Sequence, residues 1–135
     1  ILAYQALPIE LEEKIRERVV IHCYEGRTDG SMPEILHSLI RKHPVTGKTA
    51  LYGAADTGIG IVDMEAVEAM KLYLEIGEFA TQDKFVYRHQ YQLNDLVIWD
   101  NAQLLHSAEV LTRANSKQEQ RIMHRVSVRG WPETD

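Results

Sequence analysis

The sequence predicts a mainly β fold that also carries helices. Two observations lead to this class. Most apolar segments have the length of a short strand and are bounded by turn residues, and only two segments show helical periodicity. Short antiparallel strands with two helices fit a β sandwich with helical additions better than a regular α/β alternation. A length of 135 residues suits one domain.

Two helices are expected. The first covers residues 9–24, because Leu11, Ile15, Val19 and His22 recur at steps of four, four and three after Pro8. The second covers residues 64–80. Its predicted inner face is a stripe of three apolar residues, namely Val67, Met70 and Leu74.

The strands are predicted from short apolar or alternating runs. Residues 37–53 are expected to form a hairpin whose turn is 43–48, since Pro44 fixes φ and Gly47 permits a positive φ. Residues 53–60, with three glycines, are expected to form a loop. The remaining strands are expected at 84–91, 96–99, 104–108 and 122–129.

Composition excludes several classes of protein. No apolar run approaches the roughly 20 residues of a membrane span. The net charge of −5 is opposite in sign to that of a typical duplex nucleic-acid binder. A single cysteine, Cys23, excludes an internal disulfide framework. We therefore expect a cytoplasmic protein with no nucleic-acid or membrane partner.

The histidines do not form a metal motif on their own. Six are present, and none belongs to a His-x-His, His-x-Asp, His-x-Glu or His-x-x-x-His pair. A metal site contained within the chain would usually show such closely spaced ligands. Each lone histidine therefore fits a structural role better than a ligand role.

Two arginines suggest a small-anion site. Arg121 and Arg125 lie four residues apart on the last predicted strand, so their side chains share one face of it. Guanidinium groups on an inner face are costly unless they pair with anions, and their planar fork matches a carboxylate. The residues alone leave a second interpretation open, an exposed edge strand whose arginines are solvated.

Three separated motifs resemble one known family. They are the segment HPVTGKTALY at 43–52, Trp99-Asp100-Asn101 followed by His106, and the Arg-x-x-x-Arg of residues 121–125. In this order they resemble the C-terminal half of the TauD/TfdA family, the Fe(II)- and 2-oxoglutarate-dependent dioxygenases. The resemblance runs over essentially the whole chain, and it implies part of a double-stranded β-helix, or jelly roll.

The resemblance also implies site residues. His106 would be the distal histidine of a two-His-one-carboxylate iron site, which leaves coordination positions open for 2-oxoglutarate and O₂. Arg121 would bind the far carboxylate of 2-oxoglutarate. Arg125 would bind the anionic group of a small substrate of the sulfonate or aryloxyalkanoate class, which the enzyme hydroxylates, or would assist in binding 2-oxoglutarate.

One departure from the family is large, because the His-x-Asp motif that supplies the other two metal ligands does not occur in this sequence. We therefore expect residues 1–135 to be the C-terminal portion of a single dioxygenase domain that is inactive in isolation. The alternative is a non-catalytic remnant of the fold that binds a dicarboxylate. A halved jelly roll exposes sheet edges and apolar surface, so we also expect a homo-oligomer.

Overall fold

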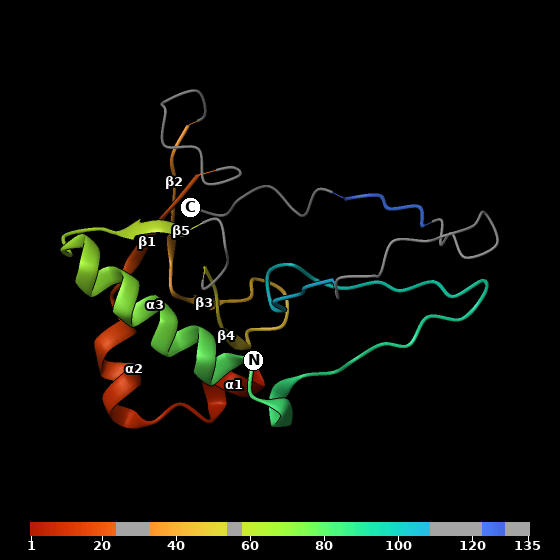
Figure 1. Cartoon of the computed structure of the whole chain (residues 1–135), viewed down its shortest axis with the longest axis horizontal. Coiled ribbons are helices and arrows are strands. Elements are labelled where there is room, and N and C mark those ends of the chain that lie inside the picture. Colours follow the sequence, from red (N-terminus) through yellow and green to blue (C-terminus); the bar gives the residue numbers. More distant parts are fainter. Residues whose placement is uncertain (24–32, 54–57, 109–122, 129–135) are drawn as a thin grey trace, which may run out of the picture. The chain divides into compact units, whose positions relative to one another are not determined.

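The computed structural model describes residues 1–23, 33–53, 58–108 and 123–128 (Figure 1). The chain divides into two units, Ile1–Leu105 and His106–Asp135, which are treated separately below. None of the helices in the described part has the length and apolar character needed to span a bilayer.

The first predicted helix is much shorter than expected. After α1 (Leu2–Gln5), helix α2 covers only Ile9–Ile15, and Val19–His22 form strand β1. The prediction of one helix over residues 9–24 is therefore wrong. A β-branched run such as Val19-Val20-Ile21 favours extended backbone. Strand β1 is paired with a neighbouring strand on each side. This pairing outweighs the helical spacing that Val19 and His22 continue from Ile15.

Five strands in the described part of the chain form two small antiparallel sheets. In the larger sheet β1 is central, with β2 (Ile35–Ser38) on one side and β5 (Gly58–Ile61) on the other. The smaller sheet is the hairpin of β3 (Ile40–Lys42) and β4 (Thr49–Leu51). The expected hairpin is confirmed with its turn over residues 40–51, whereas His37 and Ser38 of the predicted range 37–53 lie in β2 of the larger sheet. The expected loop over 53–60 is wrong at its end, where Gly58 begins β5.

Leu39 joins the two sheets. It lies between β2 and β3, and its side chain is fully buried. Its N–H donates to the carbonyl of Arg18 at 2.9 Å, and its carbonyl accepts from the N–H of Tyr52 at 2.7 Å. One residue therefore bonds to the segments that lead into β1 and out of β4. The first strand of the hairpin expected over 37–53 is therefore divided here between β2 and β3.

Helix α3 (Ala66–Ala80) is capped at its N-terminus by Glu65, whose carboxylate accepts from the N–H of Val67 at 2.8 Å. The helix itself is confirmed, but its predicted inner face is wrong. Ala69, Leu72 and Ile76 are buried, whereas the three residues of the predicted stripe are exposed, namely Val67 at 59%, Met70 at 58% and Leu74 at 58%. The helix has two apolar stripes, and periodicity alone does not tell which one faces the sheet.

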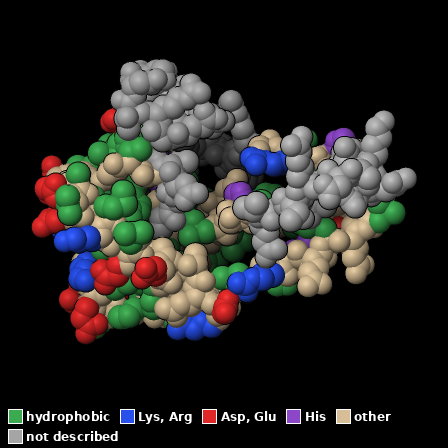
Figure 2. All heavy atoms as spheres, in the orientation of Figure 1, with side chains coloured by type: hydrophobic (Ala, Val, Ile, Leu, Met, Phe, Trp, Pro, Cys, Tyr) green, Lys and Arg blue, Asp and Glu red, His purple; other side chains and the backbone are tan. Residues whose placement is uncertain are grey.

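One hydrophobic core lies between the larger sheet and the helices. Ile15, Val20, Leu39 and Ile76 are its largest fully buried side chains. They come from α2, β1, the corner between the sheets and α3. Hydrophobic side chains also lie open among acidic ones over the helical side of the molecule in Figure 2. The described part of the chain therefore buries one apolar layer and leaves further apolar surface exposed.

The strands expected after residue 84 are not formed in the described residues. Asp83–Phe85 is a 3₁₀ turn, and residues 86–108 and 123–128 contain no strand. Leu96 and Ile98, expected in a buried strand, are 85% and 84% exposed. A strand requires a neighbour for its N–H and C=O groups, and these segments pair with none among the described residues. The coarse class, strands with a few helices, is confirmed, but a closed jelly roll is not seen in the part described.

Gly58 provides a test of the packing between β5 and α3. A Cβ at Gly58 would overlap the hydroxyl and ring of Tyr73 on α3. We expect Gly58→Ala to lower the free energy of unfolding by about 1–3 kcal/mol, measured by urea denaturation, because overpacking forces backbone shifts. Gly60→Ala is the matched control, since its Cβ would lie 3.8 Å from Ile21. Equal stability of the two variants would contradict this packing.

Candidate functional site

The three predicted site residues fall in the second unit. His106 and Arg125 are exposed and belong to no helix or strand, and Arg121 lies outside the described residues. The resemblance implies that His106 and Arg121 serve one iron and 2-oxoglutarate site, and their proximity stays a prediction. Their roles stay predictions that depend on the family resemblance.

The described residues do not assemble a metal centre. Across residues 1–23, 33–53, 58–108 and 123–128, no group of three or more His, Cys, Asp or Glu side chains is placed to hold a metal ion. Among the ligands that the resemblance implies, only His106 belongs to this sequence. The described side chains alone therefore do not fit an iron site, and no reaction step through iron is derived from them.

Asp100, in the second of the three motifs, organises a tight turn. Its Oδ1 accepts from the N–H of Ala102 at 2.8 Å, and its Oδ2 accepts from Nε2 of Gln103 at 2.8 Å. Its carbonyl accepts from the N–H of Leu104 at 3.0 Å. The hydrogen bond from Gln103, followed by that from Ala102, lowers the pKa of the Asp100 carboxyl. The turn therefore holds an ionised carboxylate immediately before the segment that carries His106.

His43, in the first motif, contacts this carboxylate. Nε2 of His43 lies 2.9 Å from Oδ2 of Asp100, and the His43 side chain is only 12% exposed. Nδ1 of the same ring accepts from the N–H groups of Val45 and Thr46 at 3.2 and 3.0 Å. An imidazole nitrogen that accepts two backbone N–H groups carries no proton, so the proton is on Nε2 and is donated to Asp100.

A second contact joins the same two turns. Oγ1 of Thr46 donates to Oε1 of Gln103 at 3.5 Å. The turn of residues 43–48 and the turn of residues 99–104 are thus linked twice, although they lie more than 50 residues apart. Sequence reasoning identified both motifs but not their contact. The only sign of this contact in the sequence was that one turn contains a histidine, His43, and the other contains an aspartate, Asp100, to which no role had been assigned.

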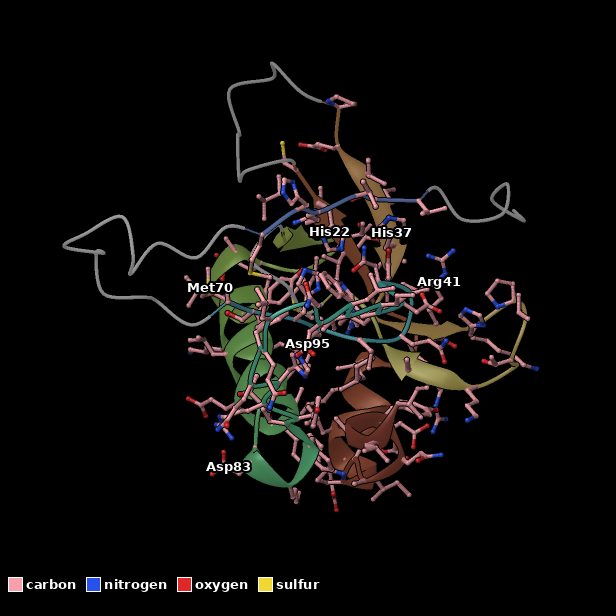
Figure 3. All side chains as sticks on the ribbon, turned by 90° about the vertical axis from the view of Figure 1, so that its right-hand side faces the viewer. His22, His37, Arg41, Met70, Asp83 and Asp95 are labelled. Carbon is pink, nitrogen blue, oxygen red and sulfur yellow. The ribbon has the colours of Figure 1, made fainter. Side chains whose placement is uncertain are left out.

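A second cluster lies on the larger sheet. The rings of His22 and His37 are 5.5 Å apart on β1 and β2, next to one another in Figure 3. Tyr52 meets His37 edge-to-face at 5.1 Å, and the guanidinium of Arg41 lies 5.0 Å from the Tyr52 ring. Sequence reasoning missed this cluster because it depends on the register that places Val20 opposite His37.

Burial changes the titration of two groups near these strands. Desolvation, and secondly the charge of His37, lowers the pKa of His22 from its ordinary 6.5. Burial raises the pKa of Tyr73 to about 12. The hydroxyl of Tyr73 has no hydrogen-bond partner among the described residues. Neutral His22 and neutral Tyr73 are therefore the folded forms near neutral pH.

The shift at His22 predicts a pH dependence of stability. The unfolded chain binds a proton at His22 near pH 6.5, whereas the pKa of His22 in the folded chain is lower. The free energy of unfolding is therefore undiminished by His22 above pH 6.5 and decreases as the pH falls below it, because protonation then favours the unfolded chain. We expect the urea midpoint to fall between about pH 7 and about pH 5, and His22→Gln to flatten this decline. His124→Gln, at an exposed residue, is the control and should leave the profile unchanged. An unchanged profile in His22→Gln would contradict the assignment.

Comparison with known proteins identifies the family. Residues 1–127 match the family model of the "Taurine catabolism dioxygenase TauD, TfdA family". The chain belongs to this family. A TauD/TfdA relationship was expected from the three motifs, and it is confirmed over almost the whole sequence.

The similar curated relatives are longer than this chain. The alpha-ketoglutarate-dependent 2,4-dichlorophenoxyacetate dioxygenase of Burkholderia sp. (strain RASC) is 33% identical over an alignment of 116 positions that covers 77% of this chain and 39% of that protein. The (S)-phenoxypropionate/alpha-ketoglutarate-dioxygenase of Sphingobium herbicidovorans is 31% identical, covering 82% of this chain and 36% of that protein. The chain thus spans about two fifths of these relatives.

Solved structures of this family resemble the fold. The crystal structure of AAD-2 in complex with Mn(II) and N-oxalylglycine has a TM-score of 0.69 and 33% identity, covering 76% of this chain and 44% of that one. A 2,4-D dioxygenase structure from Burkholderia xenovorans, described as putative and alpha-ketoglutarate-dependent, has a TM-score of 0.68 and 29% identity, with the same coverage. The relatives' names agree with the expected dependence on 2-oxoglutarate.

Proposed function

We propose that this chain is the C-terminal part of an Fe(II)- and 2-oxoglutarate-dependent dioxygenase that hydroxylates a small anionic substrate. The observation that carries the proposal is the family match over residues 1–127. The complex of AAD-2 with Mn(II) and N-oxalylglycine supports both cofactors. N-oxalylglycine replaces one methylene of 2-oxoglutarate with N–H, and Mn(II) takes the same oxygen and nitrogen ligands as Fe(II).

The proposed substrate is an aryloxyalkanoate. Relatives with 31–33% identity are named for 2,4-dichlorophenoxyacetate and phenoxypropionate. A sulfonate is the second candidate, because a taurine dioxygenase structure matches with a TM-score of 0.58 and 26% identity. In both cases the substrate is an anion of the kind that an arginine binds through charge-assisted hydrogen bonds.

Each proposed site residue has a separate task. The imidazole of His106 would hold the metal, and the missing ligands would come from the part of the domain outside this sequence. The guanidinium of Arg121 would bind the far carboxylate of 2-oxoglutarate, and that of Arg125 the substrate anion. Bound iron with 2-oxoglutarate and O₂ would supply the oxidation, while these side chains would orient and neutralise the reactants.

The exposed surface agrees with a partial domain. Apolar side chains are exposed on α3 and also after residue 84, among them Val67, Met70, Leu96 and Ile98. In the proposed jelly roll the remaining part of the domain would cover this surface and supply neighbouring strands for the segments after residue 84. Association of several copies of the chain would bury the same residues.

The test is turnover of 2-oxoglutarate by the protein that carries this chain. Succinate is measured with Fe(II), 2-oxoglutarate and O₂, in the presence of 2,4-dichlorophenoxyacetate, of taurine or of neither. The proposal expects succinate production that the aryloxyalkanoate stimulates more than taurine does. Tight 2-oxoglutarate binding with no succinate under any condition would instead support the non-catalytic, dicarboxylate-binding alternative. No turnover and no binding would overturn both.

A further inference from the structure

We propose that His43 is a positioning residue for the chain segment that carries His106. The imidazole would clamp the turn of residues 43–48 to the turn of residues 99–104, and so set the point from which the chain continues to His106. This inference rests on the proposed function, because it takes His106 to be a metal ligand. His43 itself contacts no metal and is given no catalytic role.

The geometry uses both nitrogens of the ring. On one side Nδ1 accepts two backbone N–H groups, from Val45 and Thr46, which fixes the ring relative to its own turn. On the other side Nε2 lies 2.9 Å from Oδ2 of Asp100. A histidine is well suited to this arrangement, since one neutral ring accepts at one nitrogen and donates at the other.

Asp100 passes this restraint to the backbone ahead of His106. While Oδ2 faces His43, Oδ1 accepts from the N–H of Ala102 at 2.8 Å. The carbonyl of Asp100 accepts from the N–H of Leu104, two residues before His106. Gln103 also donates to Oδ2 at 2.8 Å, so the turn keeps its own hydrogen bonds without His43. It would lose the shorter of its two links to the turn of residues 43–48, and we expect it to open more readily.

The charge of the carboxylate strengthens the link. The His43 side chain is 12% exposed and that of Asp100 is 45% exposed, so a shielded donor reaches a carboxylate that keeps part of its contact with water. A hydrogen bond to an ionised group is stronger than one between neutral groups. The contact from Thr46 to Gln103 is longer, at 3.5 Å, and lies at an exposed site. His43 is therefore the stronger of the two links.

Two variants separate the functions of the two nitrogens. Asparagine at position 43 offers an oxygen near the place of Nδ1 but is too short to reach Asp100. Glutamine offers an N–H near the place of Nε2 but no acceptor for the two backbone N–H groups. If the clamp positions the His106 segment, His43→Asn should disturb that segment and His43→Gln should largely preserve it. If His43 instead only stabilises its own turn through Nδ1, His43→Gln should disturb the protein more than His43→Asn.

The experiment has two readouts in the dioxygenase that carries this chain. We expect His43→Asn to speed hydrogen exchange at the amides of Ala102 and Leu104 roughly tenfold, the effect of losing one hydrogen bond to a charged group. We expect it to weaken Mn(II) binding, followed by electron paramagnetic resonance, by roughly tenfold or more, the range for residues that orient a metal ligand. His43→Gln should stay within about threefold of the wild type in both.

His89→Gln is the matched control. His89 forms an equivalent pair with Asp95, with 3.0 Å between Nε2 and Oδ2, in a different turn. Its replacement should change neither the Mn(II) affinity nor exchange at Leu104. Equal effects of His43→Asn and His43→Gln, or no effect of His43→Asn in a protein that binds Mn(II), would overturn the positioning role and leave the proposed function intact. A wild-type protein that does not bind Mn(II) would overturn the proposed function and the positioning role with it.

Discussion

Replacing His106 with alanine is expected to lower 2-oxoglutarate turnover by the full dioxygenase at least about a hundredfold. Loss of residues that merely orient a metal ligand already costs about 10- to 100-fold, so loss of a ligand should cost no less. The measurement is succinate formed per minute at saturating Fe(II). Metal binding by the same variant, titrated with Mn(II), should weaken in parallel.

His124→Ala is the control for this change. His124 lies between the two arginines of the third motif, and in the strand predicted for this segment its side chain would lie on the opposite face from theirs. It is the other histidine of the C-terminal motifs, and its loss is expected to change turnover only a few-fold. If His124→Ala abolished turnover and His106→Ala did not, the metal ligand would be His124, and the alignment of the motifs would be wrong.

The second large effect is a separation between Arg121 and Arg125. Arg121→Ala should raise the KM for 2-oxoglutarate by about 30-fold or more, because truncating one partner of a hydrogen-bonded charge pair costs about 2 kcal/mol or more. Arg125→Ala should raise the KM for the aryloxyalkanoate while sparing the slow consumption of 2-oxoglutarate without substrate. Steady-state kinetics with each reactant varied in turn measures both.

Lysine variants provide the control for charge. Arg121→Lys retains the positive charge but not the two-pronged geometry that matches a carboxylate, so an intermediate KM for 2-oxoglutarate is expected. Equal changes in both KM values from either alanine variant would show that the two arginines share one site. In that case the assignment of the 2-oxoglutarate carboxylate to Arg121 and of the substrate anion to Arg125 would be abandoned.

Local chemistry made parts of the fold predictable. The turn of residues 43–48 follows from Pro44 and from Gly47, which takes a φ of +66°. The two strands around it pair as expected, with Ile40 opposite Leu51. Helix α3 was predicted within two residues of its start because its periodicity is long and unbroken. Each of these features is determined by residues that are neighbours in the sequence.

The candidate site was predictable only through its motifs. His106, Arg121 and Arg125 were identified because three short segments in a fixed order resemble one family, and the family itself is confirmed. Nothing in their local sequence specifies what they contact. The link between His43 and Asp100, by contrast, follows from no motif, because each residue alone resembles an ordinary turn residue.

By itself the sequence determined the family, the hairpin, the second helix and the residues on which a dioxygenase site would depend. Only the tertiary structure decided that Val19–His22 is a strand, that Ile76 rather than Leu74 faces the core, and that His43 reaches Asp100. The physical reason is the same in each case. A β-branched run, an apolar helix stripe and an imidazole each have several favourable environments, and the choice among them is made by partners that are distant in the chain.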